Sequence, residues 1–160
     1  MRSLAILGLV VVELMVVGCG NSNNSSTSTT QAANGIWESA LVGKDAGVGV
    51  FNFTTAFTVN SDNSLNVSFF SFLTTGPCFP LTGASTTGSF DVTSTSTTPT
   101  ANFQFTVQSG GSRLTLTGTA TGTTDSSGNT TWTSITGTWT VAGGTSCTGG
   151  GTFTMTETGS

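Results

Sequence analysis

Apolar residues recur at every second position along most of the chain after residue 35, and clusters of turn-forming residues interrupt them. A period of two is typical of strands with one buried face. We therefore expect an all-β domain, an antiparallel up-and-down meander that closes, or nearly closes, into a barrel. The pattern predicts eight strands. Seven lie at Ile36 to Val42, Val48 to Val59, Leu65 to Leu73, Thr86 to Ser94, Ala101 to Gln108, Arg113 to Thr121 and Thr130 to Val141, and the eighth contains Gly151, Phe153 and Met155.

The third predicted strand changes phase along its length. Leu65, Val67 and Phe69 follow one phase, whereas Phe70 and Phe72 follow the other. A β-bulge, which inserts one extra residue into a strand, would produce this change. A strand with apolar residues on both faces would produce it as well.

Glycines at inward positions favour a barrel over a sandwich. They are Gly88, Gly118, Gly137 and Gly151, where a missing side chain lets a strand coil or a neighbour approach. In the seventh strand, Trp132 is out of phase with the other apolar residues.

The inward face is rich in phenylalanine, and this leaves two hypotheses for the interior, a packed core and a ligand cavity. An eight-stranded barrel is just wide enough to be filled by side chains or to hold one small ligand. We expect a packed core, and keep an apolar ligand cavity as the alternative. The residues that would bound such a cavity are Phe51, Phe53, Phe103, Phe105 and Trp139.

The first residues of the chain form a targeting segment. Met1-Arg2-Ser3 provides a positive start, and Leu4 to Val17 is an apolar run too short to span a membrane. The step Val16-Val17-Gly18 before Cys19 resembles the lipobox of bacterial lipoproteins. The resemblance implies cleavage before Cys19, acylation of that residue and anchoring of an exported protein in the cell envelope. Because Gly20 stands where an aspartate would retain the protein at the inner membrane, it also implies the outer membrane.

Three regions follow from these features. Residues 1–18 are the predicted signal peptide, and residues 19–34 are the lipidated cysteine with a tether rich in Ser, Thr and Asn. Such a tether lets a domain stand off the membrane. Residues 35–158 are the predicted barrel domain.

Two further cysteines, Cys78 and Cys147, remain in the exported chain and predict a disulfide. They follow the third and the seventh predicted strands. In a meander, loops after odd-numbered strands lie at one end of the barrel. The topology therefore permits the bond, at the end opposite to the one where the tether arrives, and this end should point away from the membrane.

Composition excludes several functions. The chain has no histidine and no tyrosine, which removes the commonest general base and the commonest zinc ligand. Removing residues 1–18 takes Arg2 from three cations and Glu13 from seven acidic residues, which leaves two and six. Two cations cannot form a phosphate-binding surface, so we expect no nucleic-acid partner. The Thr-rich outward positions also argue against a membrane-spanning barrel.

The candidate catalytic and metal-binding residues are better interpreted as solvated side chains and as part of a turn. The acidic residues Glu38, Asp91 and Glu157 could in principle form a glycosidase pair, but Glu38 and Asp91 are out of phase with the apolar positions and should be solvated. The segment Asp125 to Asn129 resembles a calcium loop but lacks its bidentate glutamate, and a hairpin turn explains it. We therefore expect no enzyme, cofactor or metal.

The segment Gly35-Ile36-Trp37 looks like the Gly-x-Trp start of lipocalins, and the short eight-stranded domain is similar to avidin-like barrels too. In lipocalins this tryptophan packs at the barrel floor against an arginine near the end of the barrel. The only arginine left here, Arg113, opens the sixth strand. The expected function is a non-catalytic structural or binding module that engages the membrane through its anchor and has an envelope protein or a small apolar ligand as partner. The alternatives are a lipocalin-like carrier of a small apolar ligand and, second, a hydrolase.

Overall fold

The computed structural model describes residues 33–44, 51–73, 83–143 and 148–159. Cys19, Cys78 and Cys147 lie outside these residues. No helix in the described part of the chain is long and apolar enough to cross a membrane. The strands are β1 Gly35–Gly43, β2 Asn52–Val59, β3 Leu65–Phe72, β4 Ser85–Ser94, β5 Thr100–Ser109, β6 Ser112–Thr124, β7 Thr130–Ala142 and β8 Gly149–Gly159.

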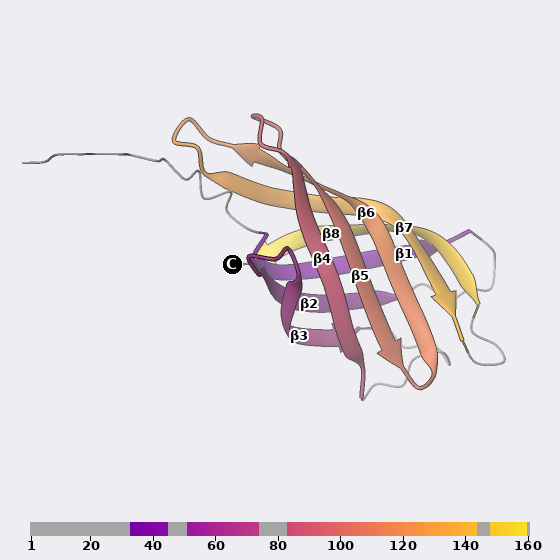
Figure 1. Cartoon of the computed structure of the whole chain (residues 1–160). Helices are drawn as coiled ribbons and strands as arrows, with labels where there is room; N and C mark the ends of the chain where they lie inside the picture. The colour runs from indigo at the N-terminus through magenta and orange to yellow at the C-terminus, as the bar shows by residue number, and fades with distance from the viewer. Residues whose placement is uncertain (1–32, 45–50, 74–82, 144–147, 160) are drawn as a thin grey trace, which may run out of the picture.

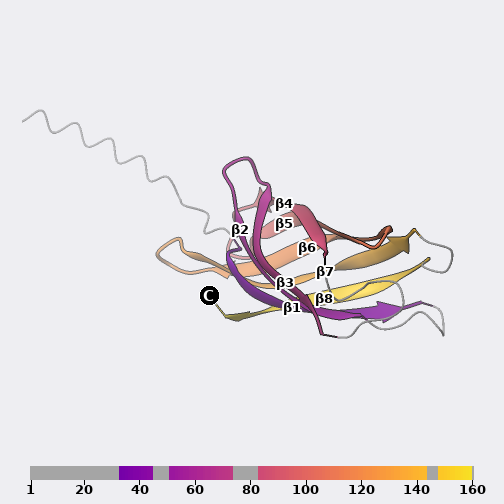
Figure 2. The same cartoon turned by 90° about the horizontal axis from the view of Figure 1, so that it is seen from below.

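The eight strands form one antiparallel sheet that curls into a nearly closed barrel, as predicted (Figures 1 and 2). The sheet order is β3-β2-β1-β8-β7-β6-β5-β4. Every neighbouring pair is therefore consecutive in the chain except β1 and β8. That pair brings the two ends of the barrel domain together, with Ile36 opposite Gly159. The remaining discontinuity, between β3 and β4, is called the seam below.

The barrel has two distinct ends. We call the end that carries the turns at 60–64, 95–99 and 125–129 the floor, because β1 begins there. The opposite end, where the odd-numbered strands finish, is called the mouth. The hairpin at Gly110 and Gly111 lies at the mouth, and the φ angles of 58° and 84° at these glycines suit a tight two-residue turn.

The interior is a column of aromatic rings that runs from the floor towards the mouth. Trp37 stacks on Phe57 with ring centroids 6.0 Å apart, and Phe57 meets Phe103 at 6.2 Å. Phe103 stacks on Phe105 at 6.1 Å, and Phe105 stacks on Phe53 at 5.9 Å. These spacings are those of favourable aromatic pairs. All five side chains are 1 % exposed or less.

Four β-bulges curve the sheet, and each has the same chemistry. In every case one strand contains one extra residue, which is a serine or threonine. Its hydroxyl donates a hydrogen bond to a carbonyl oxygen of the partner strand, which supports the local bend. The four bonds are Ser68 to Ala56 at 3.3 Å, Thr93 to Thr100 at 3.1 Å, Thr133 to Thr121 at 3.4 Å and Thr158 to Ile36 at 3.3 Å.

Two of these bulges explain the broken alternation in the sequence. Leu65 points inward, and the extra residue Ser68 shifts the alternation by one position, so that Phe70 and Phe72 also point inward. The bulge interpretation of the third strand is therefore confirmed. The extra residue Thr133 turns Trp132 inward in the same way, where it meets Phe90 edge to face at 4.9 Å.

Glycine at position 151 permits a contact between strands that are not neighbours. The indole Nε1 of Trp139, on β7, donates to the carbonyl of Val42, on β1, at 3.0 Å. Strand β8 lies between them, and a Cβ at Gly151 would collide with the Val42 carbonyl and lie 2.8 Å from the indole nitrogen. A glycine is required here because the indole crosses β8 above its backbone.

The first described residues are attached to the barrel floor. Ala33 is 2 % exposed, and its carbonyl accepts a hydrogen bond from Trp37 Nε1 at 3.3 Å. The side-chain oxygen of Asn34 accepts one from the Val59 amide at 3.0 Å. The last two residues of the predicted tether therefore pack with the domain. Arg113 opens β6 at the mouth, so the tryptophan–arginine pair of lipocalins is not formed, and Trp37 packs on Phe57 instead.

Two turns at the floor hold carboxylates that accept several hydrogen bonds. The Asn129 amide and side chain, followed by the Ser127 amide, bond to Asp125 and lower the pKa of its carboxyl below the ordinary 3.8. The hydroxyl and amide of Ser64 lower the pKa of Asp62 likewise. The Asp125 turn is thus a closed hydrogen-bonded hairpin turn, as expected.

These lowered pKa values predict a small acid sensitivity of folding. A depressed folded-state pKa stabilises the fold above the unfolded-state pKa of about 3.9, and the stabilisation is lost as the pH falls through the folded-state value. We expect the urea concentration at the midpoint of unfolding to decrease once the pH is lowered below about 4. In the double variant D62N/D125N the fall should be smaller. Equal slopes of midpoint against pH in the two proteins would contradict this.

Candidate functional site

The seam is closed at the floor by the turn between β2 and β3. Ser64 forms an antiparallel bridge with Ser89, and the carbonyl of Asn63 accepts a hydrogen bond from the Phe90 amide at 2.8 Å. The Asn63 side-chain Nδ2 also donates to Asp91 Oδ1 at 3.1 Å. These three contacts hold β3 to β4 at one end only.

The turn is built to present Asn63 to β4. The residue has a φ of 66°, the only positive value among the described residues other than glycine. Asparagine is among the residues that tolerate this left-handed conformation. Its amide donates to the Asn60 carbonyl at 3.0 Å, and the Asn60 amide donates to the Ser64 carbonyl at 2.9 Å. Local turn chemistry therefore fixes a contact between strands that do not follow one another in the sheet.

Replacing Asn63 should loosen the closed end of the seam. The variant Asn63→Ala loses the bond to Asp91 and adopts a left-handed φ that alanine disfavours, at a cost of about 1–3 kcal/mol in the free energy of unfolding. Asn63→Gly keeps the backbone conformation and should lose less. Amide exchange at Phe90, whose N–H bonds to the Asn63 carbonyl, should accelerate more in the alanine variant. Equal exchange rates in both variants would contradict a role for the backbone conformation.

Above the floor, β3 and β4 diverge. At Gly88 an added Cβ would lie 2.7 Å from Leu65 Cδ1, so the two strands still touch there. The bulge at Ser68 follows directly on β3, and bulges bend a strand and increase its twist. We attribute the divergence of β3 from β4 to this bend.

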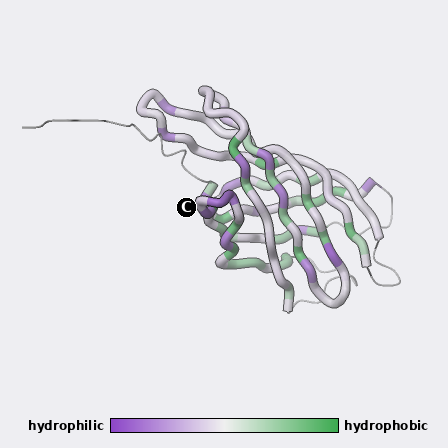
Figure 3. Tube along the Cα trace, viewed as in Figure 1, coloured by the Kyte–Doolittle hydropathy of each residue, from purple (hydrophilic) through white to green (hydrophobic). Residues whose placement is uncertain are grey.

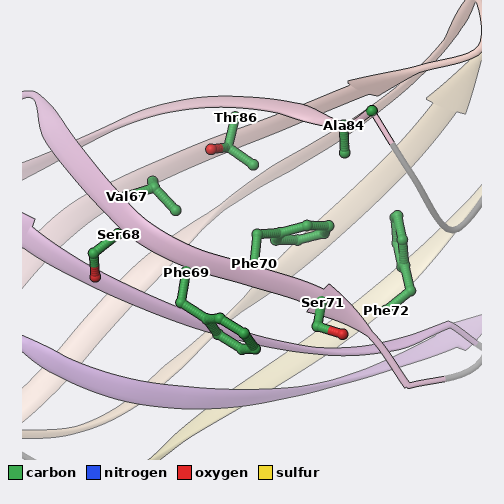
Figure 4. A pocket seen from close by; sticks show the side chains of 9 residues that line it. Val67, Ser68, Phe69, Phe70, Ser71, Phe72, Ala84 and Thr86 are labelled. Carbon is green, nitrogen blue, oxygen red and sulfur yellow. The ribbon is translucent and has the colours of Figure 1, made fainter.

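Between the diverging strands lies a groove of about 300 Å³, which we call the seam groove (Figure 4). Phe70 and Phe72 lie on the side of β3 that faces Ala84 and Thr86 of the opposite wall, whereas Phe69 lies on the other side of β3 (Figure 4). Half of the Phe69 side chain is exposed. Figure 3 shows this part of β3 in the hydrophobic colour. The complete lining is Val67, Ser68, Phe69, Phe70, Ser71, Phe72, Gly83, Ala84 and Thr86.

The groove is uncharged and its walls are strand edges. None of its lining residues is ionisable. In the sheet order β3 and β4 are the two outermost strands, and among the described residues the Ser64–Ser89 bridge is the only strand pairing between them. The walls therefore offer backbone amide and carbonyl groups beside aromatic rings, which suits an uncharged partner that can form hydrogen bonds.

The five predicted cavity residues lie in the interior and contact other rings. Their exposures range from 0 % to 3 %. Phe53, Phe103 and Phe105 belong to the aromatic column, and Phe51 meets Trp139 edge to face at 5.8 Å. This arrangement favours the packed core over a hollow one.

The seam groove and the aromatic column meet at Phe70. Its ring lies 5.1 Å from the ring of Phe53 and 6.1 Å from that of Phe105. Phe70 thus forms the inner wall of the groove and covers the column at the same time.

The acidic candidates are not brought to one place. Asp91 lies on β4 beside the seam, whereas Glu38 and Glu157 lie on β1 and β8, with β2 and β3 between β1 and the seam. Glu38 is the one ionisable residue lining a second pocket, of about 250 Å³, on the outer side of β1, β2 and β8. Within the described ranges no three His, Cys, Asp or Glu side chains cluster as metal ligands would.

Sequence reasoning did not identify the seam groove. Its signals were present in the phase change at Phe69 and Phe70, because a bulge in an outermost strand bends that strand away from a neighbour. The pairing of β1 with β8 shows that the barrel is not open between its first and last strands, but the position of the opening between β3 and β4 is given by the structure alone.

The three cysteines are outside the described residues, so acylation of Cys19 and the Cys78–Cys147 disulfide stay predictions. The described flanks of the two cysteine segments, at Leu73 and Gly143, both lie at the mouth, as the predicted bond needs. No family model, curated protein or solved structure was found to match this chain.

Proposed function

We propose that this protein is an envelope lipoprotein, exported and anchored in the outer membrane through Cys19, whose barrel is a non-catalytic binding module. The observation that carries the binding role is the seam groove. It is an accessible, uncharged site in a barrel whose described interior is occupied by its own aromatic rings. A binding role needs an accessible surface, and this groove offers backbone groups and apolar side chains together.

The position of the groove supports the anchored arrangement. The chain enters the barrel at the floor, where Ala33 and Asn34 are attached. The groove is lined by residues 67–72 of β3 and by Gly83, Ala84 and Thr86 around the start of β4, and it lies towards the mouth. A lipid on Cys19 would therefore leave the groove on the far side of the domain from the membrane.

The anchor is tested by metabolic labelling with a palmitate analogue. The wild-type protein should be labelled and should fractionate with membranes, whereas Cys19→Ser should do neither. Equal labelling of the two proteins would refute the lipoprotein assignment. This experiment leaves the binding role untouched, so the two parts of the proposal are tested separately.

The binding role is tested by site-specific photocrosslinking in intact cells. A photoreactive amino acid at Phe69, which is half exposed beside the groove, should give a defined adduct. The same amino acid at Thr138, exposed on the outer face of β7, is the control. The adduct should disappear when Phe70→Ser is added. Adducts that form equally at both positions, or survive that change, would show that the seam is not the binding site.

A lipocalin-like carrier is the alternative, and one observation favours it. Phe70 separates the seam groove from Phe53 and Phe105, so movement of one ring would connect the groove to the interior. Native mass spectrometry of protein extracted from its host should then show a bound apolar molecule. Hydrolysis is the second alternative and has the least support, because Asp91 is separated from Glu38 by two strands.

A further inference from the structure

We propose that the seam groove accepts one extended peptide segment of another protein, which adds to the edge of β4 as an extra strand. The inference rests on the proposed binding function and specifies the partner. β-Strand addition is a known mode of peptide recognition in which backbone hydrogen bonds give affinity and alternate side chains give specificity.

The backbone of β4 is oriented for this pairing. The Phe90 amide points to β3, where it bonds to the Asn63 carbonyl. In an antiparallel strand the backbone groups of alternate residues point to the same side, and the register of β4 with β5 is regular from Ser85 to Val92. Gly88 still lies against Leu65 of β3, so within the groove it is the amide and carbonyl of Thr86 that are directed into the seam. Beyond the bridge at Ser89, no described strand pairs with this edge.

The facing wall is oriented in the same way. The Leu73 amide bonds to the Asn52 carbonyl of β2 at 2.8 Å, and Thr55 donates to the Phe69 carbonyl at 2.9 Å. Residues 69 and 73 thus direct their backbone to β2. The alternate residue Phe70 directs its backbone to the seam. Two strand edges face one groove.

The walls define the chemistry of the segment. Because the lining carries no ionisable group, a charged residue in the bound stretch would lose hydration without gaining a partner. Its inward side chains would rest on Phe70 and should be apolar, and the outward ones should be small and polar. The β4 wall of the groove consists of Gly83, Ala84 and Thr86, so the stretch that pairs with β4 is short, whereas the side chains of the segment can contact β3 from Val67 to Phe72.

The geometry favours a single strand over a second copy of the barrel. The edge of β3 does not face open solvent, because β4 forms the other wall of the same groove. A second barrel would have to bring its own β3 into that space together with the strands attached to it. A peptide segment has no such attachment and can enter alone.

A phage-displayed library of random twelve-residue peptides, panned against the mature protein, tests the proposal. The enriched peptides should alternate apolar and small polar residues over an uncharged stretch. The best peptide is then synthesised with N-methyl groups on alternate amides, in two versions of opposite phase. One version should bind about tenfold more weakly or worse, since it loses backbone donors on the paired edge, and the other should bind like the parent.

Protein variants separate the possible results. Thr86→Pro removes one donor from the seam edge and should weaken binding about tenfold, whereas Thr87→Val, exposed and directed to β5, should not. Thermal unfolding of both variants checks that they fold. If Thr86→Pro and both methylated peptides bind normally while Phe70→Ser does not, strand addition is wrong and the seam binding site stands.

Three other results overturn the inference. If no seam variant changes peptide binding, the seam is not the site and the proposed function fails with the inference. If no peptide is enriched over panning against an unrelated barrel, strand addition fails, and the Phe69 crosslinking experiment decides the function. A dimer that Thr86→Pro dissociates would identify a second copy as the occupant instead.

Discussion

Gly151→Ala should cost about 4 kcal/mol of folding free energy, the largest effect we expect from a single methyl group in this protein. The new Cβ would collide with the Val42 carbonyl, a backbone atom that cannot turn aside. It would also lie 2.8 Å from Trp139 Nε1 and so block the hydrogen bond between that indole and Val42. Overpacking costs about 1–3 kcal/mol, and a buried donor without its partner costs a similar amount.

The matched control lies on the same strand. An added Cβ at Gly159 meets only Ile36 Cδ1, at 3.8 Å, which is ordinary contact. Gly159→Ala should therefore change the urea midpoint little, and both variants should keep the slope of unfolding with urea. Since small domains have a total stability of about 5–15 kcal/mol, the loss in Gly151→Ala is a large part of the whole. Similar midpoints for the two variants would show that β8 can shift to accept the methyl group.

Phe105→Ala should cost about 3–5 kcal/mol, because its ring is fully buried between other rings. It stacks on Phe53 at 5.9 Å and on Phe103 at 6.1 Å. Truncation removes both contacts and leaves a cavity that the rigid sheet cannot collapse to fill. Urea unfolding measures the loss.

The same measurement decides between a packed core and a hollow carrier. In a hollow barrel, Phe105 would face empty or ligand-filled space, and its truncation in the ligand-free protein would cost little. Phe69→Ala provides the comparison, since this ring is half exposed and its loss should cost about 1 kcal/mol or less. If the two variants lose the same stability, the packed interior is wrong and the carrier function becomes the better one.

The fold could be predicted from the sequence because its information is local. Alternation with period two identifies strands, and residues such as Gly110 and Gly111 identify a hairpin. Apart from the pair of β1 with β8, the strands then pair with their nearest neighbours in the chain. The bulge in β3 was also visible in the sequence, because Ser68 shifts the phase of Phe70.

The seam groove depends on the bend of β3 and on contacts between distant residues, which a local sequence pattern does not determine. Whether β3 and β4 pair along their length depends on how far Ser68 bends β3 and where Asn63 meets Asp91. These are relations between residues far apart in the chain. The packing of Phe53 against Phe105 is a relation of the same kind, which is why the pattern alone left a filled and a hollow interior open.

The pairing of β1 with β8 has a consequence for folding. It is the one strand pair that joins distant parts of the chain, and it places Ile36 opposite Gly159. A circular permutant that links these two ends and begins at β4 would have every strand paired with its neighbour in sequence. Loop-closure entropy slows the formation of distant contacts, so this permutant should fold faster than the natural chain. The seam, where the barrel is open, would then coincide with the termini.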